Sequence, residues 1–477
     1  MESTAHNFLR NTHKALNDRG LQSALKNARR GFVDKRRNAV DALPEFEALR
    51  QTAIDIKSHS LLNLDQYLIQ FEQQVQASGG QVHWAETPTQ ATQIVTDLCR
   101  SVNAEKITKG KTMVGEEIGL NDALIESGMQ PVETDLGEYI IQLAGEPPSH
   151  IIAPAVHKSR QQIADLFHEH HAPLGFKQPL EDPQAIVNEA RTILRNEYVT
   201  ADVGITGANL LIAETGSTVL VTNEGNGDLT ASLPRMHIVV ASIEKVVPTM
   251  EDAAVILRLL ARSATGQEIT AYTTFFTGPR READLDGPEQ FHVVLVDNHR
   301  SEMLGNQYRD MLRCIHCGAC LNHCPIYSAI GGHAYGWVYP GPMGAVLTPL
   351  MAGLKEGSHL PQASTFCGRC EEVCPLSIPL PGLLREHRFQ IHAQKINTSQ
   401  SRWALALWAF VARHPNLYRW LTRIGIGLLS RIAGKHKKFR RLPFASAWTN
   451  QRDFPAPQGP TFMSSIRSAN AKSDKDS

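Results

Sequence analysis

The sequence carries no net charge and contains no long apolar run. Lysine plus arginine and aspartate plus glutamate each number 48, so no global field attracts nucleic acid or an acidic partner. No uncharged run reaches the roughly 18 residues that a transmembrane helix needs. Residues 1–20 also lack the apolar core of a secretory signal. We therefore expect a soluble, cytoplasmic protein whose contact with a membrane would run through partner proteins.

Two motifs of nucleotide chemistry are also absent. No G-x-G-x-x-G follows a predicted strand and no G-x-x-x-x-G-K-[ST] occurs, which excludes the usual nicotinamide or flavin fingerprint and a nucleotide-hydrolysing loop. Eight cysteines are too few for a secreted disulfide scaffold in a chain of 477 residues. Seven of the eight lie between Cys314 and Cys374, however, and such crowding indicates metal in a reducing compartment.

Composition along the chain divides it into five segments. With 42% hydrophobic residues, the chain is long enough for two or more domains. Residues 1–55 are basic and helical in pattern, and we expect a solvated surface helix there. An α/β domain at 56–300 and a cysteine-rich domain at 301–390 follow. A helical C-terminal domain at 391–462 and a disordered tail at 463–477 complete the order.

The second segment alternates between helical and strand patterns. Helices are predicted at 65–78, at 252–262 and after the Thr87-Pro88 cap. Short β-branched runs suit strands buried on both faces of a largely parallel sheet covered by helices; they occur at 151–153, 218–222, 237–241 and 293–296. Cys99 shares the apolar stripe of a predicted helix, so we interpret it as a buried structural thiol.

The cysteine-rich domain contains a full and a partial copy of one motif. Residues 314–325 read CIHCGACLNHCP, the C-x2-C-x2-C-x3-C-P spacing of a cubane iron–sulfur cluster, and 367–375 read CGRCEEVCP. The copies span about 303–333 and 353–382. In two-cluster ferredoxins the fourth cysteine of each motif reaches the other cluster. This pairing predicts Cys314, Cys317, Cys320 and Cys374 on one cluster and Cys324, Cys367 and Cys370 on the other.

The second cluster is one thiolate short, because Ser364 stands where the missing cysteine would be. Three hypotheses remain open: a Ser364 alkoxide ligand, an exogenous or water ligand, or a three-iron [3Fe-4S] cluster in place of [4Fe-4S]. A zinc site is the structural alternative for any C-x2-C pair, but zinc favours even pairs of thiolates. His316 and His323 adjoin ligands and would tune a cluster rather than bind it.

Residues that could handle an organic acid are less sharply defined. Backbone amides and hydroxyls of Gly216, Ser217 and Thr218, with Asn223 and Gly225 of the NEGNG segment, could cradle an anion. The alternative is two tight turns that flank a strand. Further candidates of the same kind are Lys109, Lys111, His150 and His157.

Two features mark the C-terminal domain. Residues 403–412, WALALWAFVA, are too short to span a bilayer and predict a buried helix or a docking surface for a partner subunit. The basic run 435–441, KHKKFRR, predicts a solvated face, with an acidic partner or anionic lipid as the alternative.

Several segments resemble the lactate utilisation protein B family. They are ETDLGEYIIQL at 133–143, PSHIIAPAVHK at 148–158, ETGSTVLVTNEGNGDL at 214–229, both cysteine motifs and LPFASAWTNQRDFPAP at 442–457. The resemblance implies an α/β fold with a lactate utilisation (LUD) domain related to sugar-phosphate isomerases and CoA-transferases. An α-helical dicluster ferredoxin domain and a helical C-terminal domain would follow, with the same assignment of the seven cysteines to two [4Fe-4S] clusters.

The resemblance also implies a function. The chain would be the electron-transfer component of an L-lactate dehydrogenase system, together with companion lactate utilisation proteins A and C. It would pass electrons from lactate towards the respiratory chain, with peripheral membrane contact to reach the quinone pool. The alternatives are an iron–sulfur subunit of another 2-hydroxy-acid oxidase, similar to glycolate oxidase, and an isomerase-like or acyl-transferase-like LUD enzyme with redox-sensing clusters. Two clusters favour transfer, because one would suffice for sensing.

Overall fold

The computed structural model describes residues 3–177, 180, 182–433, 437–442, 449 and 452–466. The chain divides into two compact units, and the division falls between Ile391 and His392. The first unit holds the α/β part and the cysteine-rich part. The second unit is a small helical module, and each unit is treated by itself below.

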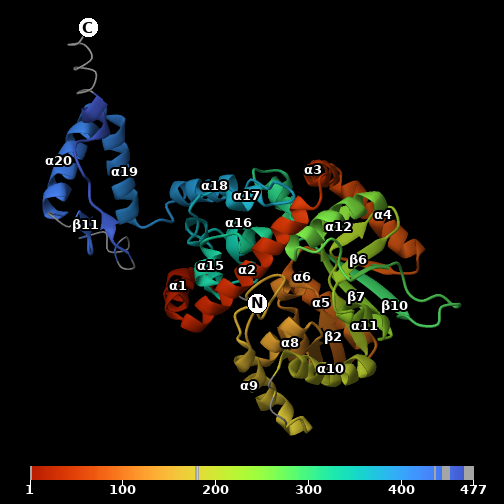
Figure 1. The fold of residues 1–477 in the computed structure, drawn as a ribbon. Coiled ribbons are helices and arrows are strands. Elements are labelled where there is room, and N and C mark those ends of the chain that lie inside the picture. The colour runs from red at the N-terminus through yellow and green to blue at the C-terminus, as the bar shows by residue number, and fades with distance from the viewer. Residues whose placement is uncertain are drawn as a thin grey trace. The chain divides into compact units, whose positions relative to one another are not determined.

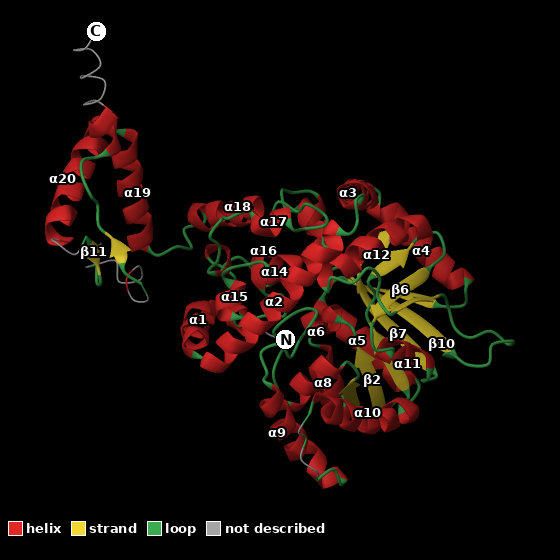
Figure 2. Ribbon diagram, in the orientation of Figure 1, coloured by secondary structure: helices red, strands yellow, loops and turns green. Residues whose placement is uncertain are grey.

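A six-stranded parallel sheet forms the centre of the α/β part (Figure 2). Its spatial order is β1 (Gln81–Ala85), β10 (Gln290–Val296), β7 (Met236–Ser242), β4 (Val203–Thr206), β2 (Lys106–Gly110) and β3 (Gln130–Glu133). The strands β4 and β7 are buried throughout, which explains why their sequences are apolar without alternation. The predictions of strands at 237–241 and 293–296 are confirmed.

The two faces of this sheet bury different partners. Ile238 and Val240 pack with α5 (Pro88–Ser101), α6 (Met113–Ile118) and α7 (Leu120–Glu126). Val239 and Ala241 face α4 (Leu64–Ala77) and a second sheet. Thr87 and Gln90 form a capping box at the start of α5, as the Thr87-Pro88 signal predicts. Cys99 is fully buried on α5, which confirms its reading as a structural thiol.

Two of the strand predictions need correction, and the first concerns a second sheet. Its order is β8 (Val246–Val247), β5 (Leu210–Ile212), β6 (Ser217–Thr222) and β9 (Tyr272–Phe276), and β6 pairs antiparallel with both of its neighbours. The run 218–222 is therefore a strand, but it lies outside the parallel sheet. The strand predicted at 151–153 is wrong, since these residues form a bend; Pro154 follows them and offers no N–H to a ladder.

The remaining helices of the α/β part cover the sheets and their edges (Figure 1). They are α3 (Phe46–Leu62), α8 (Leu136–Leu143), α9 (Arg160–His171), α10 (Pro183–Thr200), α11 (Asn226–Ser232) and α12 (Met250–Ala264). The helix predictions at 65–78 and 252–262 correspond to α4 and α12.

The cysteine-rich part consists of short helices joined by tight turns. They are α13 (Arg300–Leu304), α14 (Ala319–Asn322), α15 (Tyr327–Ile330), α16 (Gly341–Met351), α17 (Arg369–Glu372) and α18 (Leu380–Ala393). The N-terminal helices α1 (Phe8–Asn17) and α2 (Arg19–Asp41) pack beside this part, although more than 250 positions separate them in sequence (Figure 1). Phe8 meets the ring of Tyr335 edge-on at 5.7 Å, and Gln22 donates to the Ala329 carbonyl at 2.7 Å. The expectation of a merely solvated N-terminal helix is therefore wrong.

The second unit contains α19 (Ser399–Arg413), α20 (Pro415–Ala433) and a two-stranded ribbon of β11 (Lys438–Phe439) and β12 (Phe454–Pro455). No side chain of α19 is buried, and Trp403 and Trp408 are exposed. The prediction of a buried helix at 403–412 is wrong, whereas a docking surface stays a prediction. Within the described ranges no helix has the length and apolarity needed to cross a membrane. Lys435 and most of the predicted tail lie outside the described residues.

Candidate metal centre and adjoining cavity

The two cysteine motifs follow the same backbone path. His316 and Gly318 adopt left-handed conformations with φ of 55° and 71°, and Phe366 and Gly368 repeat this pattern with 53° and 79°. Gly318 and Gly368 each precede a four-residue helix, α14 and α17 respectively. Glycine adopts a left-handed conformation without strain, so the C-G dipeptide in each copy lets the chain turn between two cysteines.

The seven cysteines of the two motifs line two separate small cavities. The members of the first group are Cys314, Cys317, Cys320 and Cys374. The members of the second group are Cys324, Cys367 and Cys370, and Ser364 lines the same cavity. Each cavity thus takes residues from both copies of the motif.

The first group, in which Cys317 and Cys374 are buried and Cys314 and Cys320 partly buried, suits a polynuclear iron centre. Burial, together with the neighbouring Cys374, raises the pKa of the Cys317 thiol to about 12. Burial also raises the pKa values of Cys314 and Cys320, to which the other thiols of the group add. Thiolate, not thiol, is the metal ligand. Four thiolates gathered in one place therefore need a compensating cation, which iron supplies.

The second group lies nearer the surface. Cys367 is exposed, and the pKa of its thiol is lowered, chiefly by the backbone N–H of Arg369. Cys370 is partly buried, and burial raises its pKa to about 12. The second cavity thus combines a solvent-facing sulfur with sheltered ones.

Ser364 occupies the place that Cys314 holds in the first copy. The His316 N–H donates to Cys314 Sγ at 3.4 Å, and the Phe366 N–H donates to Ser364 Oγ at 3.1 Å. The same backbone group, two residues further along the chain, therefore contacts the side chain in both copies. A serine hydroxyl here replaces a soft donor by a hard one.

Arginines from the N-terminal helices hold the loop that ends the second motif. Arg36 of α2 donates to the Val373 carbonyl at 2.8 Å, and Arg50 of α3 donates to the Cys374 carbonyl at 2.9 Å. Arg36 is buried, and this burial lowers the pKa of its guanidinium. Both cations lie beside the first cysteine group, where they favour the more negative, reduced state of a cluster.

A cavity of about 320 Å³ adjoins the first cysteine group. Its wall includes Lys111 just after β2, Asp135 just after β3 and Asn223 just after β6. Ligands of open α/β sheets bind beyond the carboxyl ends of the strands, where these residues lie. His316, between Cys314 and Cys317, forms part of the same wall, and its Nε2 is buried with no hydrogen-bond partner in the described part of the chain.

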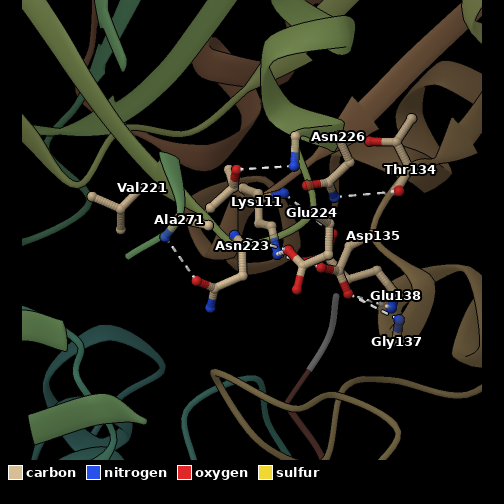
Figure 3. Close-up of polar contacts among 12 residues, drawn as sticks. Lys111, Thr134, Asp135, Gly137, Glu138, Val221, Asn223, Glu224, Asn226 and Ala271 are labelled. Carbon is tan, nitrogen blue, oxygen red and sulfur yellow. Dashed lines mark hydrogen bonds and ion pairs between the residues drawn. The ribbon is translucent and has the colours of Figure 1, made fainter. Parts of the chain in front are cut away.

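Charged groups of both signs meet in this cavity (Figure 3). Lys111 Nζ pairs with Asp135 and, at 3.2 Å, with Glu224 Oε2. Burial opposes the charge on Lys111, but Asp135 and Glu224 outweigh it and raise its pKa. Burial raises the pKa of Glu138 well above its usual range, and Glu133 adds to this. Burial and the neighbouring carboxylates thus disfavour the charged form of Glu138.

Lys245 contributes a second amine to the cavity wall. Its Nζ donates to the Ala208 carbonyl at 2.5 Å. Burial lowers the pKa of Lys245, although Glu244 acts in the opposite direction. The cavity wall thus combines two lysines with the carboxyl group of Glu138, whose pKa is raised.

The residues predicted from sequence to bind an anion lie at two separate places in the structure. Gly216, Ser217 and Thr218 lie at the start of β6, whereas Asn223 and Gly225 follow its end. A strand of six residues is about 20 Å long, so the two ends cannot bind one small ligand together. Of these five residues, Asn223 lines the cavity.

The other predicted candidates have separate surroundings. Lys109 is buried against Glu116 and Glu133, at 2.6 and 2.7 Å, and has a structural role. His150 bonds to Asn322 Oδ1 at 3.0 Å, while the His323 ring bonds to the Ala319 carbonyl at 2.9 Å. Lys111 does line the cavity. Sequence reasoning missed Asp135, Glu138, Glu224 and Lys245. The first three lie in segments that resemble the family, at 133–143 and 214–229, but no motif there assigned them to a site.

Comparison with known proteins places this geometry in a defined class. The LUD domain model matches residues 68–296, and the 4Fe-4S dicluster domain model matches residues 310–378. The chain is thus an iron–sulfur protein with a LUD domain, as the predicted α/β fold and cluster motifs require. A DUF162 family protein from Deinococcus radiodurans, known from a crystal structure, is 17% identical with a TM-score of 0.28, over 49% of this chain and 98% of that one.

Relatives define the family. Lactate utilization protein B of Lysinibacillus sphaericus is 43% identical over 97% of both chains, and that of Geobacillus sp. is 43% identical over 98% of both. The electron transport protein YkgF of Escherichia coli is 41% identical, again over 98% of both chains. The chain belongs to the lactate utilization protein B family, which confirms the resemblance drawn from the sequence.

Proposed function

We propose that this chain is the iron–sulfur electron-transfer protein of a lactate utilisation system. The observation that carries the proposal is the pair of cysteine-lined cavities inside a matched 4Fe-4S dicluster domain. The names of the relatives, lactate utilization protein B and electron transport protein, give the pathway and the role. In finer detail, the system oxidises L-lactate to pyruvate with companion proteins A and C and delivers electrons to the respiratory chain.

Each cavity would hold one iron–sulfur cluster. Cys314, Cys317, Cys320 and Cys374 supply four thiolates for a complete [4Fe-4S] cluster. The second cavity supplies three, from Cys324, Cys367 and Cys370, and its fourth iron would face Ser364. When bound, the clusters take up and release single electrons. The protein holds the sulfurs in place, and backbone N–H groups donate to Cys314 and Cys324 Sγ.

The electron path would run from the first cluster outwards to the second. Cys317 and Cys374 of the first group are buried, whereas Cys367 of the second group is exposed. Oxidation of lactate to pyruvate releases two electrons and two protons, and two one-electron clusters can together accept both electrons. The exposed second cluster then passes electrons to an acceptor protein, one at a time.

The test is reduction of the clusters by lactate. Anaerobic protein is mixed with L-lactate, D-lactate or glycolate, with and without the companion proteins, and cluster reduction is followed by electron paramagnetic resonance. We expect reduction by L-lactate when the companions are present. Turnover of an acid by the isolated chain without cluster reduction would contradict the electron-transfer proposal.

A second candidate is that the cavity of this chain binds the hydroxy acid itself. Lys111 and Lys245 could pair with its carboxylate, and His316 Nε2 has no partner within the described ranges. The same experiment separates the two candidates, because this one requires L-lactate to reduce the clusters without the companion proteins.

The serine at position 364, where the first motif has a cysteine, gives a direct prediction about iron content. We expect Ser364→Cys to complete the second cluster, because position 364 repeats that of Cys314. After mild oxidation, iron should remain at about eight per chain in the variant and fall to about seven in the wild type. Iron and acid-labile sulfide analysis measures this. Ser364→Ala is the control; loss of iron from that variant alone would instead identify the serine oxygen as a ligand.

A further inference from the structure

Three metal-ligating side chains converge away from both cysteine groups. Glu146 follows α8, His157 precedes α9, and His333 comes from the cysteine-rich part. One ligand atom from each lies within 4.8 Å of the other two. They line a separate cavity of about 240 Å³. None of the three lines the 320 Å³ cavity or either cysteine cavity.

One ring nitrogen of each histidine is held by a neighbouring oxygen atom. His333 Nε2 lies 2.8 Å from the Pro147 carbonyl, which can only accept, so Nε2–H donates and Nδ1 has a free lone pair. The Ser149 hydroxyl donates to the Pro154 carbonyl at 2.9 Å. When the hydroxyl donates there, it accepts from His157 Nδ1–H at 2.7 Å, which leaves the lone pair on His157 Nε2.

In this tautomer two hydrogen-bond acceptors, one on His157 and one on Glu146, face each other. The His157 Nε2 lone pair lies 2.8 Å from Glu146 Oε2. Lys158 Nζ contacts the other carboxylate oxygen, Glu146 Oε1, at 2.5 Å. A metal cation bound by both Nε2 and Oε2 would turn their contact from repulsion into attraction.

We propose that Glu146, His157 and His333 bind a divalent transition metal ion of the zinc type. Imidazole nitrogens and a carboxylate oxygen are the donors that Zn²⁺ prefers, with water in the remaining position. The non-ligating nitrogen of each histidine is held by a carbonyl or a hydroxyl group, which is the outer-shell arrangement of metal-bound histidines.

The ion would join the two parts of the first unit. Glu146 and His157 belong to the segment matched by the LUD domain, and His333 belongs to the segment matched by the dicluster domain. The two segments are already in close contact here, because a Cβ atom added to Gly332 would lie 1.8 Å from the Ser149 carbonyl oxygen. The opposite side of the 149–157 loop lines the 320 Å³ cavity through Ile151, Ile152, Ala153 and Pro154. The metal ion therefore fixes one wall of that cavity.

The test is zinc binding to cluster-loaded protein, which leaves no cysteine of the motifs free to compete. The protein is treated with a chelator, equilibrated with Zn²⁺ alone and passed through a desalting column, and metals are counted by mass spectrometry. We expect about one zinc per chain in the wild type. His157→Asn and His333→Asn should weaken binding at least about tenfold, with cluster iron unchanged.

His299→Asn is the matched control, since His299 Nδ1 also lies 2.8 Å from a carboxylate, that of Glu302, outside the three-ligand group. Equal zinc retention in the wild type and in the His157 and His333 variants would overturn the proposal. X-ray absorption at the zinc edge of the wild-type protein does not depend on the folding of any variant. It should show nitrogen and oxygen ligands, and sulfur ligands would also overturn the proposal.

Discussion

Cys374→Ala is expected to abolish the same cluster as Cys320→Ala, although the two residues come from different copies of the motif. Both line the first cavity, so each variant removes one of its four thiolates. Cys324→Ala should instead resemble Cys370→Ala, because both of these residues line the second cavity. Each variant should lose about half of the iron. Lactate-dependent electron transfer should fall to background, because the path through two clusters is interrupted.

The measurement is electron paramagnetic resonance of the reduced protein, with iron and sulfide analysis. Cys99→Ala is the control, since Cys99 is buried on α5 away from both groups and its removal should leave the iron content unchanged. A sequential pairing, in which Cys314 to Cys324 bind one cluster, makes a different forecast. Under it, Cys324→Ala would match Cys320→Ala, and that result would refute the interleaved pairing.

Arg300→Met is expected to destabilise the protein more than the loss of any exposed ion pair. Arg300 is 2% exposed and contacts Glu117 Oε2 at 2.7 Å and Glu244 Oε2 at 2.9 Å. Tyr339 also donates to Glu117 Oε2, at 2.6 Å. Without the guanidinium, two carboxylates remain buried without their cation. Breaking such a pair costs about 3–5 kcal/mol of the free energy of unfolding.

Urea unfolding of the cluster-loaded protein, followed by circular dichroism, measures this loss. Arg258→Met is the matched control, because Arg258 pairs with Glu45 at the same 2.7 Å but both side chains are nearly half exposed. An exposed pair contributes about 0–1 kcal/mol. Equal effects of the two variants would show that Arg300 does not support the junction of the α/β and cysteine-rich parts.

The features that the sequence predicted correctly are those that depend on residues close together in the chain. The C-x2-C spacing fixes a tight turn, and Gly318 and Gly368 adopt the left-handed backbone that this turn needs. The capping box at Thr87 depends on residues three positions apart. The strand predicted at 151–153 failed because its three apolar residues pack towards a cavity wall instead of a ladder. Propensity alone cannot separate these two environments.

The cavity could not be assembled from the sequence, because its residues meet only through the sheet. Lys111, Asp135 and Asn223 follow three different strands, and the parallel order of β2 and β3 brings the first two together. The burial of Arg36 was missed for the same reason. Its acceptor, the Val373 carbonyl, is 337 positions away, and no periodicity within α2 could indicate it.

The contact between α2 and Val373 also bears on how the protein is made. A ribosome releases the N-terminal helices long before the loop that Arg36 and Arg50 hold, and contacts of such large sequence separation form late. The apolar sides of α1 and α2 therefore have no packing partner until almost the whole first unit has been synthesised. Iron delivery during synthesis would meet a half-built cysteine pocket, so maturation of the first cluster belongs after translation.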